Sequence, residues 1–200
     1  MYPSFLKLTG RHVVLVGGGR VAAGKLAGLL ADRAHVTVVA PEIRPELEQP
    51  GVTLKRRAFE PGDLDEAWYV VAAAPPDVNR EVLSAAEHRR VFVNAVDDPP
   101  HASAYAGGVV RRAGVTIAFS TDGRAPALAG LLREALDAWL PADLDAWMSA
   151  ADEARRAWKR DGVPMERRRP MLLEALNRLY DEKRDQLPTP DSQLPRRVGG

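Results

Sequence analysis

With 200 residues, the chain has room for one nucleotide-binding domain of ordinary size and a modest extension, but not for two full-sized catalytic domains. Its 28 Lys and Arg residues nearly balance 27 Asp and Glu residues, and the net charge of +1 argues against a dedicated nucleic-acid binder. Cysteine is absent, which excludes disulfides, thiolate metal sites and cysteine nucleophiles; without a membrane-length apolar run or a signal-peptide pattern, we expect a soluble cytoplasmic protein.

Short apolar runs alternate with helical patterns through the first half of the chain, which predicts a doubly wound parallel α/β sheet of the Rossmann type. The first run is apolar almost throughout, as expected of a strand buried on both faces. The segment after it has Ala22, Leu26 and Leu29 at helical spacing. Strands are predicted at His12–Val16, Val36–Val39, Val52–Arg57, Tyr69–Ala73 and Val91–Val96.

The pattern of the second half is mostly helical. An apolar run at Val115–Phe119 precedes a turn at Thr121–Pro126, and a last helix is expected around Met171–Asp185. Trp139 and Trp147 lie on two apolar helical stripes outside the sheet, which favours a subunit interface and a homodimer. We expect a dinucleotide-binding domain over 1–112, a dimerisation segment over 113–148, a C-terminal helical region over 149–187 and a disordered tail over 188–200.

The glycine turn Gly17-Gly18-Gly19 stands where the first strand gives way to a helix. In Gly17-x-Gly19-x-x-Ala22 the first Gly permits a tight turn, the second lets the backbone approach a pyrophosphate, and the small Ala allows close helix packing. A phosphate would lie at the helix N-terminus. The overlapping segment to Lys25 opens like a P-loop, but Leu26 replaces the magnesium-binding Ser or Thr, so an NTPase is disfavoured. An ordinary tight turn is the alternative.

The acid expected to bind the adenosine ribose should follow the second strand. Glu42 is the carboxylate within reach, although it lies slightly late, and a solvated loop residue is the alternative interpretation. No Arg replaces the acid, which favours NAD over NADP, but the nearby Arg44 leaves the choice open.

The fifth strand ends in Asn94-Ala-Val-Asp97-Asp98-Pro, which places carboxylates at the edge of the sheet where ligands bind in open α/β folds. Asp97 could serve as a general base, or be a turn residue before proline. His101 could also transfer a proton, but an ordinary surface histidine is favoured, because no histidines pair at metal-ligand spacing.

Basic residues occur in short runs, most of which we expect on solvated faces. Any that lined the binding site would suit a substrate with several carboxylates. No Tyr is followed by Lys four residues later, which disfavours a short-chain dehydrogenase. The runs are Lys55–Arg57, Arg89–Arg90, Arg111–Arg112 and Arg167–Arg169, with Arg124 alone in the later turn.

Taken together, the motifs resemble those of the precorrin-2 dehydrogenase and sirohydrochlorin ferrochelatase family, which includes the N-terminal part of siroheme synthases. The resemblance covers roughly residues 1–140, whereas the C-terminal helices match in pattern only. The matching segments are Phe5–Leu8, Val16–Ala22 with Lys25, Val36–Pro41, Ala72–Ala73 with Val78–Asn79, Val93–Pro99 and Ser120–Pro126.

The resemblance implies an NAD-dependent oxidation of precorrin-2 to sirohydrochlorin, and in some members insertion of Fe²⁺ or Co²⁺ as a metal substrate. It also implies a homodimer, a tetrapyrrole substrate and Asp97 as the base. Cofactor contacts are implied for Gly17, Gly18, Gly19, Arg20, Val21, Ala22, Pro41, Glu42, Ala73, Val78 and Asn79, and substrate contacts for Asn94, Ser120, Thr121 and Arg124.

Two segments depart from the family pattern. Tyr105-Ala-Gly-Gly replaces an aromatic-rich stretch, so the local substrate wall differs, and Thr121 is followed by Asp122 rather than by a small hydroxyl residue before the glycine. The second departure speaks against phosphorylation-type regulation at this turn. The rival hypothesis from another class is a non-catalytic NAD-sensing Rossmann module; Asp97 and the paired arginines favour the enzyme.

Overall fold

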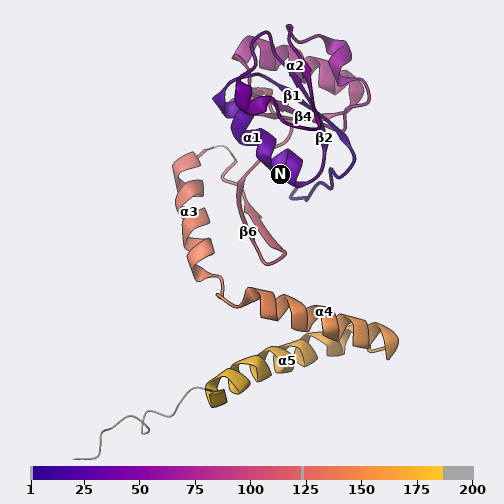
Figure 1. Cartoon of the computed structure of the whole chain (residues 1–200), viewed down its shortest axis with the longest axis vertical. Coiled ribbons are helices and arrows are strands. Elements are labelled where there is room, and N and C mark those ends of the chain that lie inside the picture. Colours follow the sequence, from indigo (N-terminus) through magenta and orange to yellow (C-terminus); the bar gives the residue numbers. More distant parts are fainter. Residues whose placement is uncertain (1, 123, 187–200) are drawn as a thin grey trace, which may run out of the picture. The chain divides into compact units, whose positions relative to one another are not determined.

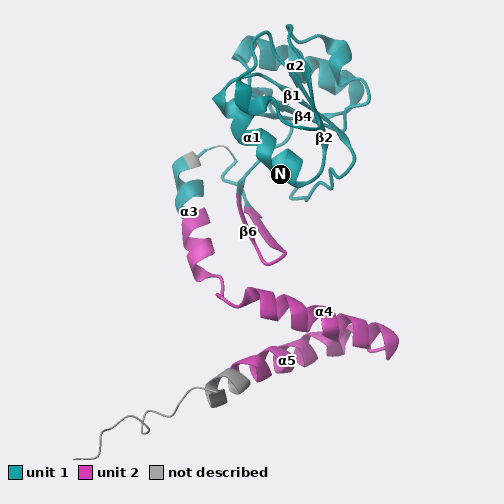
Figure 2. Ribbon diagram, viewed as in Figure 1, with its two compact units in different colours: residues 1–108, 119–131 teal, residues 109–118, 132–200 magenta. Residues whose placement is uncertain are grey.

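The computed structural model describes residues 2–122 and 124–186, so the tail expected over 188–200 lies outside the described residues. The chain forms two compact units (Figure 2). Residues 1–108 and 119–131 make up the first unit, and residues 109–118 and 132–200 make up the second. The four-part division expected from the sequence stays a prediction.

The first unit is built on a five-stranded parallel sheet (Figure 1). Its strand order is β3-β2-β1-β4-β5, which is the Rossmann order and confirms the fold class predicted from the sequence. Four strand ends lie in one row of the register, Val39, Val16, Ala72 and Ala95. The strands are β1 His12–Val16, β2 His35–Val39, β3 Val52–Lys55, β4 Tyr69–Ala72 and β5 Phe92–Ala95.

Two α-helices and two short 3₁₀ helices connect these strands. Helix α1, Arg20–Ala31, joins β1 to β2, and α2, Pro76–Arg89, joins β4 to β5. The 3₁₀ helices are η1, Pro45–Leu47, between β2 and β3, and η2, Pro61–Leu64, between β3 and β4. Each α-helix covers its own face of the sheet, as a doubly wound fold requires.

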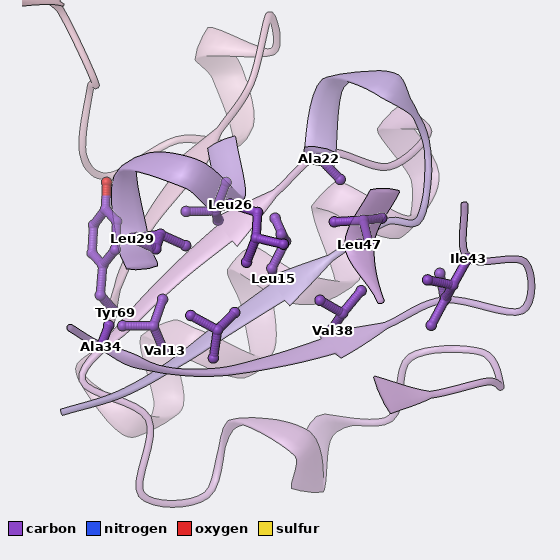
Figure 3. Packing of buried hydrophobic residues seen from close by; sticks show 13 residues of the cluster. Val13, Leu15, Ala22, Leu26, Leu29, Ala34, Val38, Ile43, Leu47 and Tyr69 are labelled. Atoms are coloured by element: carbon purple, nitrogen blue, oxygen red, sulfur yellow. The ribbon is translucent and has the colours of Figure 1, made fainter. Parts of the chain in front are cut away.

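Alternate residues of the central strand supply the two halves of the core. Val13 and Leu15 pack with the α1 side chains Ala22, Leu26 and Leu29, as Figure 3 shows. Residues Val14 and Val16 instead join the cluster of α2, with Val82, Ala85 and Ala86. Burying a side chain such as Leu26, which is fully buried, contributes about 2 kcal/mol. The expected burial of β1 on both faces is therefore confirmed.

The basic run Lys55–Arg57 is partly exposed, as expected, but two of its side chains also reach a buried partner. Strand β3 ends at Lys55, because the chain then turns toward η2, whose Asp63 carboxylate is buried. Lys55 Nζ lies 2.8 Å from Asp63 Oδ1, and the Arg57 guanidinium donates to both carboxylate oxygens at 2.6 and 2.8 Å. These two side chains therefore hold β3 to η2.

After β5 the described residues form a third short 3₁₀ helix, a hairpin and three α-helices. Strand β6, Gly108–Arg112, pairs with β7, Val115–Phe119, and was missed by the sequence prediction because its glycine and arginines break the apolar pattern. Helix α5 begins at Met165 rather than near Met171 and continues through Pro170. The helices are α3 Pro126–Trp139, α4 Leu144–Arg160 and α5 Met165–Gln186.

Within the second unit, side chains join consecutive elements. The Arg112 guanidinium on the hairpin donates to the Asp137 and Leu140 carbonyls at the end of α3, at 2.6 and 3.0 Å. The Trp147 indole of α4 donates a 2.9 Å hydrogen bond to the Tyr180 hydroxyl of α5, and the two rings meet edge to face. Arg112 is thus a structural residue here. None of the helices in the described part of the chain is long and apolar enough to cross a bilayer.

Candidate functional site

The sheet changes winding direction between β1 and β4. The chain leaves β1 for the helix on one face and leaves β4 for the helix on the other, so the two connections diverge at the carboxyl ends of adjacent strands. Ligands of open α/β sheets bind at this kind of switch point. The glycine turn after β1 and Ala73 after β4 flank it here, and Asp97 follows the next strand.

The three glycines of the turn have different structural roles. Gly17 has φ of +121°, and a side chain on it would overlap the Ala73 carbonyl. A side chain on Gly18 would overlap the Glu42 carbonyl, whereas a Cβ on Gly19 would meet nothing within 4 Å. Gly17 and Gly18 are therefore required by the protein itself, and Gly19 leaves open space where a ligand can approach the backbone.

Helix α1 begins directly after this open position. Gly19 is its N-cap and makes no side-chain capping bond, and the first turn carries no acidic residue. The first N–H groups of a helix have no partner within the helix and attract anions together with the helix dipole. Arg20 and Val21 are exposed at this end, whereas Ala22 is buried against the sheet. The turn and the helix end therefore fit a pyrophosphate, which supports the predicted use of a dinucleotide.

The loop after β2 lies against the glycine turn. Arg44 N donates a 3.0 Å hydrogen bond to the Gly18 carbonyl, and Ile43 anchors the loop in the core. Pro41 and Glu42 are exposed, which leaves the Glu42 carboxylate available to a ligand beside the turn. Arg44, the residue that left the choice of cofactor open, pairs with Glu46 at 2.7 Å.

The first turn of α2 forms the next part of the site. Ala73 lies in the turn after β4, and Val78 is partly buried against the core. Asn79 is 1% exposed; its Oδ1 accepts from Ala74 N at 3.3 Å and its Nδ2 donates to Asp98 Oδ2 at 3.0 Å. Both ends of the Asn79 amide are thus occupied within the protein, so its support of a cofactor would be indirect.

The two aspartates after β5 differ sharply in environment. Asp97 is exposed and adopts a left-handed conformation with φ of +57°. Asp98 is mostly buried, and its carboxylate binds the Asn79 amide and the His101 Nδ1. Its pKa is lowered chiefly by the Asn79 hydrogen bond and further by His101, against a smaller opposing effect of burial. The Asp97 carboxylate is therefore accessible from outside, whereas the Asp98 carboxylate is already bound to Asn79 and His101.

Sequence reasoning missed the pair of Asp98 and His101. His101, interpreted as an ordinary surface histidine, is only 20% exposed in its side chain and lies 2.8 Å from the Asp98 carboxylate. Its position is set by the 3₁₀ helix η3, Pro99–His101, which brings residues three apart onto one side. An Asp and a His at this spacing, beside prolines, is the signal that could have indicated the pair.

Asn94, implied as a substrate contact, lies in the interior. It is 6% exposed, and its Nδ2 donates to the Ala104 carbonyl at 3.1 Å. The Ser103 hydroxyl accepts from Val93 N at 2.9 Å. These two hydrogen bonds hold the segment after η3 against β5. Asn94 therefore fixes the two ends of the loop that carries Asp97.

The turn before α3 holds its own hydroxyl groups. Ser120 Oγ accepts from Asp122 N at 3.1 Å, and Thr121 Oγ1 accepts from Ala125 N at 3.3 Å. Arg124 is exposed, and its amide donates to the Thr121 carbonyl at 3.0 Å. The hydroxyls shape the turn, whose exposed charged side chains include Asp122 and Arg124.

The described side chains do not suggest a site for a resident metal ion. Among residues 2–122 and 124–186, no three His, Asp or Glu side chains come together as a set of metal ligands.

Comparison with protein families agrees with this geometry. A family described as "Putative NAD(P)-binding" matches residues 4–108, just over half of the chain. Its extent covers the sheet, the glycine turn and the loop of Asp97.

Curated relatives extend the similarity into the helices. The chain is 39% identical over 180 residues to the siroheme synthase of Photorhabdus laumondii, covering 88% of this chain and 38% of that protein. It is 40% identical over 172 residues to siroheme synthase 3 of Aeromonas hydrophila, covering 84% of this chain and 37% of that protein. The chain thus spans less than two-fifths of the length of these relatives.

Among solved structures, the chain is similar to one described as SirC, precorrin-2 dehydrogenase. The TM-score is 0.68 at 25% sequence identity, and the match covers 87% of this chain and 88% of the other. The similarity therefore reaches beyond the sheet and includes most of the region after residue 108.

Proposed function

Because this chain belongs to the NAD(P)-binding family matched over residues 4–108, we propose that it is an NAD-dependent dehydrogenase that oxidises precorrin-2 to sirohydrochlorin. The observation that carries the proposal is the similarity to SirC over 87% of this chain, since it accompanies the exposed Asp97 carboxylate at the same edge of the sheet as the glycine turn. A family of NAD(P)-binding sheets alone would not indicate a tetrapyrrole substrate.

The residues that would hold the cofactor follow from the geometry. Gly19 and the N–H groups of the first turn of α1 would bind the pyrophosphate, and Glu42 would bind the adenosine ribose. The bound NAD⁺ supplies the hydride acceptor. Ala73 and the first turn of α2 would line the side toward β4, where their backbone lies closest to the turn.

The substrate loses two hydrogens in this oxidation, one as a hydride and one as a proton. We assign the proton to the Asp97 carboxylate, which is exposed after β5. Ala95 lies in register with Ala72 and Val16, so the ends of β5 and β1 are two strand spacings apart, about 10 Å. The exposed Arg124 guanidinium would pair with a substrate carboxylate, and Ser120 and Thr121 would shape the turn that presents it.

Metal insertion is a second activity of the same carboxylate in this proposal. Fe²⁺ or Co²⁺ would enter as a substrate, and Asp97 would accept the protons that leave the pyrrole nitrogens. The proposal needs no resident metal site.

We also propose that the protein is a homodimer joined through α3. Leu128, Leu131, Leu132 and Trp139 are all exposed on this helix, and Trp139 is 78% exposed. An apolar surface of this kind is typical of a subunit interface. Trp147 does not share that role, since it packs on Tyr180 in the same chain.

The direct test is an anaerobic assay of the purified protein with precorrin-2 and NAD⁺. We expect one NADH, followed by its absorbance, for each sirohydrochlorin formed. Binding of NAD⁺ without turnover of precorrin-2 would contradict the dehydrogenase and favour the NAD-sensing module. Adding Fe²⁺ or Co²⁺ to sirohydrochlorin in the same preparation tests metal insertion separately, with the rate above the protein-free rate as the measurement.

A further inference from the structure

The Asp98 carboxylate joins the two sides of the site. Its Oδ2 accepts from Asn79 Nδ2 at 3.0 Å, and its oxygens lie 2.8 and 2.9 Å from His101 Nδ1. Asn79 in turn accepts from Ala74 N at 3.3 Å. A continuous chain of hydrogen bonds therefore runs from the end of β4, beside the glycine turn, through α2 to the loop after β5.

Asp97 directly precedes the carboxylate at the centre of this chain of hydrogen bonds. Its φ of +57° is a left-handed conformation, which residues other than glycine adopt less often. Val96 N donates to the Ala72 carbonyl at 2.8 Å on one side, and the Asp98 side chain is fastened on the other. The contacts on both sides of Asp97 thus fix the left-handed turn in which it lies.

The charge of Asp98 is needed for this arrangement. An ionised carboxylate accepts from two donors at once, and both bonds gain strength from its charge. The Asn79 hydrogen bond, with a further contribution from His101, lowers the pKa of Asp98, so the carboxylate is ionised at neutral pH. An asparagine at position 98 keeps the shape but offers one acceptor oxygen in place of two.

We propose that Asp98 is a positioning residue that acts through Asp97, holding the exposed carboxylate toward the cofactor side by joining Asn79 to His101. The inference rests on the dehydrogenase function proposed above and deepens it. In this proposal the two adjacent aspartates act together, because the Asp98 carboxylate holds Asp97 in position.

A double-mutant cycle in the complete chain tests the inference. We expect Asp98→Asn to lower kcat about tenfold while the KM for NAD⁺ changes less than twofold, because the bonds lost adjoin Asp97 rather than the glycine turn. In an Asp97→Asn background the same change should have no further effect on kcat, since the group that it positions is gone. An equal loss in both backgrounds, or no loss in either, would overturn the inference.

A second measurement does not depend on turnover. In the wild type, NMR should detect the His101 Nδ1 proton bound to a carboxylate, and the Val96 amide, which donates to the Ala72 carbonyl next to Asp97, should be protected from hydrogen exchange. Asp98→Asn should remove the first signal and speed the exchange, with an unchanged melting temperature as the check on folding. His101→Gln identifies the resonance among the four histidines. Unchanged exchange at Val96 would overturn the inference, whereas a wild type without turnover would contradict only the proposed function.

Discussion

The backbone amide of Arg44 donates a 3.0 Å hydrogen bond to the carbonyl of Gly18, so the loop after β2 is fastened to the middle of the glycine turn. The approach is so close that Gly18 has no room for a side chain on that side, and Gly17 has none beside Ala73. Only Gly19 of the three faces open space. This difference separates residues that shape the turn from the one that would meet the cofactor.

We predict that Gly19→Val weakens NAD⁺ binding by about ten- to a hundredfold, because the side chain blocks hydrogen bonds from the backbone to a charged pyrophosphate. Calorimetric titration measures the affinity, and the melting temperature should stay close to that of the wild type. The matched variant Gly18→Ala should instead lower stability by about 1 to 3 kcal/mol, since its Cβ overlaps the Glu42 carbonyl. Equal NAD⁺ affinity in a folded Gly19→Val protein would remove the assignment.

Glu42 is predicted to favour NAD over NADP. Its exposed carboxylate would accept a hydrogen bond from the ribose hydroxyl of NAD and repel the additional phosphate of NADP. Glu42→Gln should therefore reduce the ratio of the two affinities by about tenfold, measured by calorimetry with both cofactors. Glu48→Gln is the control, because that exposed carboxylate pairs with Arg56. An unchanged ratio in Glu42→Gln would assign the selectivity to another residue.

Replacement of Asp97 by asparagine should lower turnover of precorrin-2 by about 10²- to 10⁴-fold while NAD⁺ affinity persists, because the amide cannot accept the proton. Single-turnover absorbance measurements would follow the loss. Glu66→Gln is a matched control: Glu66 is also an exposed carboxylate at positive φ, but it precedes β4 at the opposite end of the sheet. Turnover near the wild-type value in Asp97→Asn would require another base.

Asp63 should support stability in a pH-dependent way. Burial alone would raise the pKa of this carboxyl, but the hydrogen bonds from Arg57 and Lys55 outweigh burial and hold the pKa below its ordinary value of 3.8. Because the folded state lowers the pKa, the contribution is complete above that value and is lost as the pH falls below it. Asp63→Asn should cost about 2 kcal/mol at pH 7, measured by urea unfolding, and less at pH 3.

The control for Asp63 is Asp65→Asn. Asp65 also pairs with an arginine, Arg89, but its side chain is 68% exposed, so its loss should cost less than about 1 kcal/mol. Similar losses for the two variants at pH 7 would show that the buried pair adds nothing beyond an exposed one.

The dimer proposal predicts about twice the subunit mass of 21.8 kDa in sedimentation equilibrium. Trp139→Asp should weaken the association by about thirtyfold or more, as expected for an aromatic residue central to an interface. Trp68→Asp is the comparison, since Trp68 is also exposed, at 58%, but lies in the sheet unit. A monomeric wild type at micromolar concentration would contradict the proposal.

The sheet could be predicted from the sequence because its information is local. Each strand of the sheet is an apolar run whose observed ends lie within two residues of the predicted ones, and Gly17 marks the first turn. The ion pairs of the basic run Lys55–Arg57 could not be predicted in the same way, because contact with Asp63 depends on how the chain turns after β3. Helix α5 begins before the predicted start near Met171 and continues through Pro170, although proline usually marks a helix boundary.

The sequence indicated which loops carry the candidate site residues, but not which partners each side chain contacts. Asp97 and Asp98 are the same residue type in adjacent places, and only the three-dimensional partners Asn79 and His101 tell them apart. Asn94 likewise matches a substrate position, yet its amide holds Ala104. A motif gives the neighbourhood of a side chain, whereas its direction depends on contacts made across the fold.

The return of the chain along β5 also affects self-association through the sheet. An edge strand with unpaired backbone groups can recruit a strand from another molecule. Val93 lies in the middle of β5, and its N–H already donates to the Ser103 hydroxyl while its carbonyl accepts from Ser103 N and Ala104 N. The backbone groups at the centre of this edge strand are therefore already hydrogen-bonded. A strand from another molecule could pair with β5 only after displacing the loop that carries Asp97.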